Sequence, residues 1–531
     1  MAQPPLPNNG RSKVLFAIGA RLGLRTLIVS ISAFVAACSA ATVFQANAVT
    51  EKLGADKRAS ILKMRALTGQ DREVSAVQVE GVERTAPSTG GPMDAHILYV
   101  HGMGWAERAG TVGDSWHLVR ALEKAYGVSG SFMRMARMCA EGSQVGPVPP
   151  KGGLRLGRKG LQPFSTDDPQ SPIVVGSIAC MDRVVLDLGD RGRVSVYRLL
   201  WDDLLYDAVL YPHIGYDDDI FSSIETAYAA SAAGEVSVPG YENLHSLRAP
   251  RMANVKDNLS SYGLSEAALY LGELGNAMRE SVAAAICLVA DESEGVGNAF
   301  AELAAQHRKV SSIDDAYIDI DVDQACKPSP KPRTRATFSI VTESLGSRVV
   351  FDTFAFDPEA RLAQRLAQTP DAAPLEVFML ANQIPLLAPG RLQSLAGKPP
   401  GSVKARLVAI SEINDVLSYE LVPYFEHLYN MRCRLQQSPE CPMKDSMVAR
   451  MAQHRGLLLD NAARRRLSRQ LGFDAIDVRA KFAPPLPFFS DAVDPEVAHG
   501  TYLDRSDLVR VVLCGVEQGR VRGAADGCLT R

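Results

Sequence analysis

The stretch His96-Ile97-Leu98-Tyr99-Val100-His101-Gly102-Met103-Gly104-Trp105 decides how the rest of the chain is interpreted. After the leading histidine, four apolar residues form a short run that is typical of a buried strand. The two glycines that follow let the backbone pass close to another segment. A loop of this kind can present backbone N–H groups to a negatively charged oxygen. We therefore expect a buried strand that ends in an anion-binding loop.

A second predicted strand leads to a serine. Residues 338–341 are mostly apolar, Thr342-Glu343-Ser344-Leu345-Gly346 follows, and residues 348–354 suit a helix. This order predicts a strand, a tight turn and a helix, with Ser344 at the apex. A serine hydroxyl is a weak nucleophile that needs a nearby base and oxyanion donors. The pattern departs from G-x-S-x-G because Thr342 replaces the first glycine, and alone it also suits an ordinary serine in a buried turn.

Two later strands precede an acid and a histidine. Residues 406–410 form an apolar run before Asp415, and residues 475–481 lead through a proline-rich loop to His499. Taken singly, Asp415 suits a turn or a helix cap, and His499 suits a surface loop. Together with Ser344, each behind a predicted strand, they supply the residue types of a nucleophile, an orienting acid and a general base.

The four segments resemble the α/β-hydrolase superfamily, in particular its serine esterases and lipases, whose triads follow the order nucleophile, acid, histidine. The resemblance extends from about His96 to Cys514. It implies an α/β fold, the α/β-hydrolase fold, in which a mostly parallel central sheet is flanked by helices. It also implies large cap-type insertions above the sheet.

The resemblance assigns roles to individual residues. Ser344 would attack a carbonyl carbon, His499 would act as general base and then general acid, and Asp415 would fix the imidazole tautomer. The implied oxyanion hole consists of the backbone N–H groups of Met103 and Leu345, within an oxyanion loop formed by His101, Gly102 and Gly104.

Spacing predicts how one domain accommodates 531 residues. About 240 residues separate His101 from Ser344, far more than a strand connection needs. We therefore expect one hydrolase domain over residues 73–531. A cap-type insertion over about residues 127–335 and a smaller helical insertion over about residues 425–472 would interrupt it.

The N-terminus has the features of an export signal. Basic residues precede the apolar run 26–35, and Val35-Ala36-Ala37-Cys38 resembles the lipobox of bacterial lipoproteins, which implies lipidation of Cys38. Residues 1–37 are then a signal peptide or membrane anchor, and residues 38–72 a tether. A retained anchor and a plainly secreted form stay open as alternatives. All three interpretations place the catalytic part in the bacterial cell envelope, facing the periplasm or the exterior.

Cysteines and charge narrow the class of protein further. Eight cysteines remain besides Cys38, which suits disulfides in an oxidising compartment. We predict the pairs Cys433–Cys441 and Cys514–Cys528, because each closes a short loop. The spacing of cysteines and histidines does not suggest a metal site, and we expect no cofactor.

The net charge of the chain bears on its partners. A net charge of −3 gives no excess of basic residues, so nucleic acid is not an expected partner.

The leading hypothesis is a membrane-tethered serine hydrolase that cleaves carboxylic esters of small-molecule or lipid-derived substrates through an acyl-enzyme. Two alternatives stay open. One is an acyltransferase or thioesterase that uses the same triad. The other is a catalytically silent binding or structural protein of the envelope that has kept the hydrolase fold.

Overall fold

The structure is a computed structural model of the chain. It describes residues 60–66, 94–102, 115–128, 132–134, 153–156, 179–200, 265–272, 274–294, 317–320, 322–327, 337–355, 361–367, 375–387, 405–436, 465, 467–468, 471, 473–486, 489–493, 495–517 and 520–521.

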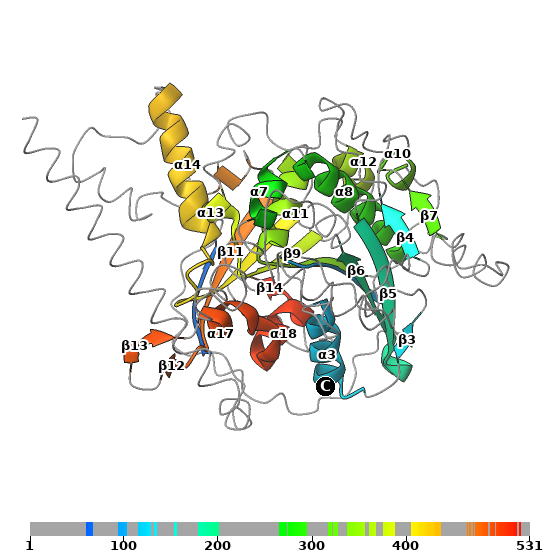
Figure 1. Cartoon of the computed structure of the whole chain (residues 1–531), viewed down its shortest axis with the longest axis horizontal. Helices are drawn as coiled ribbons and strands as arrows, with labels where there is room; N and C mark the ends of the chain where they lie inside the picture. The colour runs from blue at the N-terminus through cyan, green and yellow to red at the C-terminus, as the bar shows by residue number, and fades with distance from the viewer. Residues whose placement is uncertain are drawn as a thin grey trace, which may run out of the picture.

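A mostly parallel sheet forms the centre of the molecule (Figure 1). Its strands follow the order β1-β11-β10-β9-β8-β2-β6-β5-β4-β7, with β3 paired to β5. Every neighbouring pair from β6 to β11 is parallel, so the carboxyl ends of these strands meet at one edge. The six parallel strands are β6 (Arg193–Leu200), β2 (Ala95–Val100), β8 (Thr337–Glu343), β9 (Leu375–Leu380), β10 (Ala405–Glu412) and β11 (Phe473–Lys481). The predicted mostly parallel α/β sheet is thus present.

Strands at both ends of the sheet add antiparallel pairs. β5 and β6 form the hairpin that the glycines of residues 189–192 predict, around the 3₁₀ helix η1 (Gly189–Arg191). Both Gly189 and Gly192 have positive φ, which a glycine adopts without strain. The remaining strands of the sheet are β1 (Ser60–Ala66), β3 (Phe132–Arg134), β4 (Gly153–Leu156), β5 (Ala179–Asp187) and β7 (Tyr317–Ile320).

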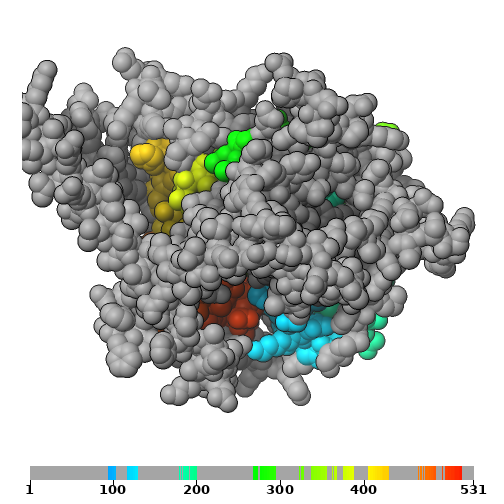
Figure 2. All heavy atoms as spheres, in the orientation of Figure 1, coloured from blue at the N-terminus to red at the C-terminus, as the bar shows by residue number. Residues whose placement is uncertain are grey.

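Helices cover the sheet on both faces, as Figure 1 shows. The helices over one face are α7 (Ser265–Leu271), α8 (Leu274–Ser293), α10 (Val322–Ala325), α11 (Leu345–Ala355), α12 (Arg361–Ala367), α13 (Ile384–Leu387) and α14 (Leu421–Gln436). Over the other lie α3 (Ser115–Tyr126), α17 (Pro495–Gly500), the 3₁₀ helix η6 (Tyr502–Asp504) and α18 (Ser506–Cys514). α3 and α18 pack side by side, and both are visible at the surface in Figure 2.

Alternating side chains on each strand build two cores. Leu98 and Val100 of β2 face the core beneath α8 and α11, whereas Ile97 and Tyr99 face the core beneath α3 and α18. Strands buried on both faces read as continuous apolar runs, because neither face is solvated. This is why residues 97–100 and 377–380 carry so little polar character.

The structure corrects part of the expected domain organisation. Residues 60–66, predicted to lie in the tether, form β1, which pairs antiparallel with β11 at the edge of the sheet. β5, β6 and α8 fall within the predicted cap, yet the two strands belong to the sheet and α8 packs on it. Long spacing alone does not distinguish a cap from extra sheet elements. Residues 73–79, whose alternating apolar and polar side chains predict a first strand, lie outside the described residues.

Two smaller hairpins follow the main sheet. β12 (Pro485–Leu486) pairs with β13 (Phe489–Val493), in the proline-rich loop that leads to α17. β14 (Val516–Glu517) pairs with β15 (Arg520–Val521).

A disulfide joins Cys287 of α8 to Cys326 directly after α10. This pair was not among those predicted, because 39 residues separate the two cysteines and only the fold brings them together. Cys514 is also disulfide-bonded. Its predicted partner Cys528, and the side chains of the predicted Cys433–Cys441 pair, lie outside the described residues.

Candidate active site

Ser344 occupies a strained turn between β8 and α11. It has a φ of 51°, a left-handed conformation that costs a residue with a side chain about 1 to 3 kcal/mol. The backbone N–H of Ser344 donates to the carbonyl oxygen of Leu380 at the end of β9, with N and O 2.9 Å apart. The turn is thereby tied to the neighbouring strand and holds the serine at the carboxyl edge of the sheet.

Two glycines allow the turn to approach β2. A Cβ at Gly102 would lie 2.6 Å from Ser344 Cβ, and a Cβ at Gly346 would lie 2.4 Å from the carbonyl oxygen of Val100. Real Cβ atoms do not come so close to other atoms, so both positions need glycine. Thr342 replaces the other expected glycine, and its hydroxyl donates to the carbonyl oxygen of Phe378 over 3.3 Å. A small β-branched residue therefore fits at the end of β8.

The predicted oxyanion loop is placed only in part. His101 and Gly102 are buried directly after β2, beside the serine turn. Leu345 is the first residue of α11, so its backbone N–H belongs to a helix N-terminus, where such groups can bind an anion. Met103 and Gly104 lie outside the described residues, as does Cys38.

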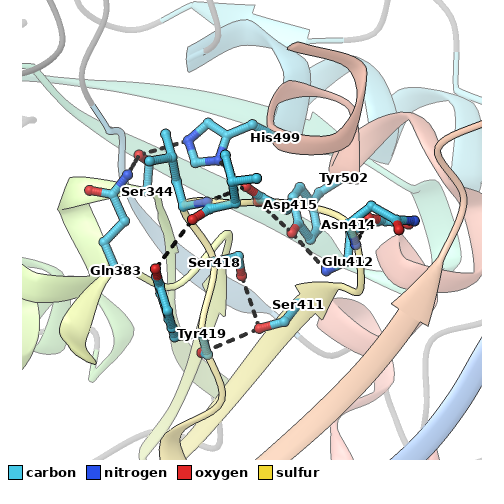
Figure 3. A network of polar contacts seen from close by, with 12 residues as sticks. Ser344, Gln383, Ser411, Glu412, Asn414, Asp415, Ser418, Tyr419, His499 and Tyr502 are labelled. Carbon is cyan, nitrogen blue, oxygen red and sulfur yellow. Dashed lines mark hydrogen bonds and ion pairs between the residues drawn. The ribbon is translucent and has the colours of Figure 1, made fainter. Parts of the chain in front are cut away.

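His499 joins the serine to the acid (Figure 3). Its Nε2 lies 3.0 Å from Ser344 Oγ, and its Nδ1 lies 3.0 Å from both carboxylate oxygens of Asp415. A carboxylate only accepts hydrogen bonds, so Nδ1 must carry the proton that it receives. Nε2 of the neutral ring is then an acceptor, and the Ser344 hydroxyl donates to it. These contacts join three side chains that are far apart in the sequence into one chain of hydrogen bonds.

Asp415 has further donors around it. The backbone N–H of Leu417 donates to Oδ1 over 3.0 Å, and the Tyr502 hydroxyl donates to Oδ2 over 2.9 Å. The pKa of Tyr502 is raised well above its usual value. Burial is the larger cause, and the negative charge of Asp415 is the second. Tyr502 therefore keeps its proton and remains a donor. Its hydroxyl oxygen in turn accepts from the backbone N–H of Glu412, 2.8 Å away, so the tyrosine links the acid to the end of β10.

Sequence reasoning missed two side chains of the site. Gln383 lies just beyond β9, and its amide Nε2–H donates to Ser344 Oγ over 2.8 Å. Tyr502 follows His499 by three residues. The position of Gln383 after a buried parallel strand is a signal in the sequence, because the carboxyl ends of such strands form the binding edge of a sheet. No comparable pattern points to Tyr502.

Comparison of the chain with protein-family models, with curated proteins and with solved structures finds no match. In the described part of the chain, no group of three or more His, Cys, Asp or Glu residues is placed to hold a metal ion. No helix within that part combines the length and the apolar character needed to cross a membrane.

Proposed function

We propose that the protein is a serine hydrolase that cleaves carboxylic esters through an acyl-enzyme. The observation that carries the proposal is the hydrogen-bonded sequence from Asp415 through His499 to Ser344. Buried polar groups are normally hydrogen-bonded, so hydrogen bonds alone do not indicate catalysis. Here, however, the serine lies on a turn whose strain costs free energy, and packing of the core does not require that strain. A serine with an imidazole acceptor and a carboxylate behind it is the arrangement that activates a hydroxyl as a nucleophile.

The reaction would proceed in two halves. Ser344 Oγ forms a bond to the carbonyl carbon while its proton passes to His499 Nε2, and the carbonyl π electrons move to the oxygen. Asp415 stabilises the resulting imidazolium. The backbone N–H of Leu345, together with that of Met103, would hold the oxyanion. Collapse of this intermediate expels the alcohol, which takes the proton from His499, and water then attacks the acyl-enzyme by the same steps in reverse.

The topology of the sheet supports assignment to the α/β-hydrolase fold. The nucleophile follows β8, the acid follows β10 and the histidine follows β11. In chain order this is the nucleophile, acid, histidine sequence of that superfamily. β2, which carries the proposed oxyanion loop, lies directly beside β8 in a parallel register. The fold assignment rests on this correspondence of strands and site residues.

Exposed apolar side chains on the segments that carry Gln383 and Asp415 favour an ester with an apolar acyl or alcohol group. Among the described residues, the exposed large apolar side chains are Leu386, Ile413, Val416 and Tyr419. The last three flank Asp415 within one loop, and Leu386 lies in α13, three residues beyond Gln383. Exposed apolar groups that gather in one place mark binding surfaces more often than isolated ones do.

We also propose that the chain acts in the cell envelope, tethered through a lipid on Cys38. This rests on the lipobox-like sequence alone. Globomycin, which blocks processing of lipoprotein precursors, should cause an unprocessed form to accumulate. An unchanged precursor, or a Cys38→Ser protein that stays fully membrane-bound, would favour a retained anchor instead.

The decisive experiment combines turnover with active-site labelling. Wild-type protein should hydrolyse p-nitrophenyl esters from acetate to palmitate, and a fluorophosphonate should add once per chain as fluoride leaves. Ser344→Ala should abolish both, and His499→Ala should lower both by at least about 10³-fold. Wild-type protein that neither labels nor turns over any ester would contradict the proposal and favour a noncatalytic binding role. Labelling without ester turnover would instead indicate another acyl acceptor or substrate.

A further inference from the structure

Gln383 contacts the reacting atom of the proposed site. Its amide Nε2 lies 2.8 Å from Ser344 Oγ, and the side chain is almost fully buried, with 1% of the residue exposed. Resting on the proposed function, we propose that Gln383 is a catalytic residue. Its N–H fixes the orientation of the Ser344 hydroxyl and stabilises that oxygen as it loses its proton.

The geometry leaves the serine oxygen one arrangement. A hydroxyl has one hydrogen and two lone pairs. The hydrogen points to His499 Nε2, 3.0 Å away, and one lone pair accepts from Gln383. Only the second lone pair is then free to attack a carbonyl carbon. Gln383 and His499 together therefore select the rotamer and the direction of attack.

The backbone of Gln383 is tied to the nucleophile turn. Its N–H donates to Ser347 Oγ over 3.1 Å, and that hydroxyl donates to the carbonyl oxygen of Ser344 over 2.6 Å. Ala381, two residues before Gln383, has a φ of 51°. Ser344 and Ala381 are the non-glycine residues with positive φ in the described part of the chain. Two strained turns at the ends of adjacent strands thus converge on one oxygen atom.

Buried groups beneath the site hold the segment that follows Gln383. The Arg348 guanidinium, which is fully buried, donates to the carbonyl oxygen of Ile384 over 3.2 Å and pairs with Asp352 over 2.9 Å. The Tyr270 hydroxyl donates to the same carboxylate oxygen of Asp352 over 2.6 Å. Because α11 carries both Ser344's turn and Arg348, movement of Gln383 relative to the serine would break these contacts.

Contacts with the acid loop hold the segment from the other side. Asn382 accepts from the backbone N–H of Ile384 over 3.2 Å and donates to the carbonyl oxygen of Tyr419 over 2.7 Å. The backbone N–H of Tyr419 donates back to the carbonyl oxygen of Asn382 over 2.9 Å. The turn that carries Gln383 is therefore attached both to the serine helix and to the loop of Asp415. Figure 3 shows the contact of the Gln383 side chain with Ser344.

The chemical step explains why such a donor accelerates attack. As His499 removes the proton, Ser344 Oγ gains negative charge before its new bond to carbon is complete. An N–H that already points at this oxygen becomes a charge-assisted donor at that moment, without any rearrangement. No atom leaves or joins Gln383, and its hydrogen bond weakens once Oγ has become an ester oxygen.

Two substitutions test the inference in the full-length protein. Gln383→Met keeps a side chain of similar length but removes the donor, and Gln383→Glu keeps the shape but places an acceptor there. We expect kcat for a p-nitrophenyl ester and the rate of fluorophosphonate labelling to fall about 10- to 100-fold in Gln383→Met, and further in Gln383→Glu. KM should stay within about twofold, because the ground-state contacts with the substrate are unchanged. Gln364→Met, on the exposed face of α12, is the matched control and should behave like wild type.

The possible results separate the inference from the proposed function. If wild type labels and Ser344→Ala does not, but Gln383→Met labels at the wild-type rate or faster, the inference is overturned and the hydrolase proposal stands. If wild type itself fails to label, the proposed function is overturned and the inference with it. If Gln383→Met unfolds more easily in a thermal melt, Gln383→Glu, which preserves the packing volume, provides the rate comparison. A wild-type rate in that variant overturns the inference equally.

Discussion

The serine turn and the acid–histidine arm reach the same point by different means. The turn is held by the backbone, through a positive φ at Ser344, a hydrogen bond to Leu380 and the close approach of Gly102 and Gly346. His499 instead sits in the short helix α17, with 23% of its side chain exposed, whereas only 1% of the Asp415 side chain is exposed.

This difference predicts different ways to fail. A backbone-held turn tolerates no added methyl group, because its neighbours are backbone atoms that cannot rotate away. A side chain held by hydrogen bonds tolerates added volume nearby but loses its orientation when a partner changes. The activity that depends on the proposed nucleophile Ser344 should therefore be sensitive to added volume, and the activity that depends on His499 to changes in its hydrogen-bond partners.

The largest effect should come from the acid. Asp415→Asn keeps the size of the side chain but presents an amide to His499 Nδ1, which favours the wrong tautomer for accepting a proton from Ser344. We expect kcat for p-nitrophenyl esters to fall about 10³- to 10⁴-fold with little change in the melting temperature. Asp187→Asn, at the last residue of β5, is the control. A fall of less than tenfold would show that Asp415 does not orient the histidine.

Adding one methyl group to the serine turn should have the next largest effect. A Cβ at Gly346 would lie 2.4 Å from the carbonyl oxygen of Val100 and 2.7 Å from that of His101. Gly346→Ala should displace the turn, and a displacement of about 1 Å can lower kcat about 10²-fold. The melting temperature should fall as well, which a thermal melt would measure.

Gly500→Ala is the matched control for the histidine arm. It also adds a methyl group, directly after His499, but a Cβ there meets nothing within 4 Å. Its activity and stability should stay close to those of wild type. Equal losses in Gly346→Ala and Gly500→Ala would remove the proposed difference between the two regions.

Removal of the Tyr502 hydroxyl should have a smaller effect of the same kind as Asp415→Asn. Tyr502→Phe deletes one donor to Asp415 and leaves the backbone N–H of Glu412 without its hydroxyl acceptor. We expect kcat to fall about tenfold, at the lower end of what the loss of a hydrogen bond to a charged group costs, about 1.5 kcal/mol, because the Leu417 N–H still donates to Asp415. Steady-state kinetics would measure this fall in kcat. An unchanged kcat would mean that the other contacts of Asp415 are enough to orient it without the Tyr502 hydroxyl.

His96, which lies outside the site, should make the stability of the fold depend on pH. Its effect on unfolding in acid can be measured separately from any effect of acid on activity. Burial lowers the pKa of His96 from an ordinary 6.5 to about 4, and its Nδ1 lies within hydrogen-bond distance of the Tyr197 hydroxyl oxygen, 2.9 Å away. Between these pH values the unfolded chain binds a proton that the folded chain does not. Stability should therefore fall by up to about 3 kcal/mol as the pH drops from 6.5 to about 4.

His96→Gln provides the test of that pH dependence. Glutamine does not titrate, so denaturant unfolding of the variant should lose less stability across this pH range than wild type does. Ester hydrolysis at pH 7 should stay near the wild-type rate, since His96 lies at the start of β2, away from its carboxyl end. If the free energy of unfolding fell equally with pH in both proteins, the pKa of His96 would not be lowered on folding, and the prediction would be wrong.

Much of the parallel sheet was predictable because its strands are buried on both faces. Residues 97–100, 338–341, 375–380 and 406–410 are apolar runs bounded by polar loops, and each lies in a strand. β1 was not predictable in the same way. It is an edge strand of mixed polarity, SILKMRA, whose place depends on pairing with β11 some four hundred residues later.

The sequence by itself determined which residue types follow which strands: a glycine-rich loop after β2, then Ser344, Asp415 and His499 in the order of a hydrolase triad. Local patterns carry that information because strands, turns and helices depend on neighbouring residues. Only the tertiary structure decided that Gln383 contacts the serine, that Tyr502 contacts the acid and that Cys287 pairs with Cys326. These contacts join residues 39 or more positions apart, and they depend on strand order and helix packing, which no short stretch of sequence records.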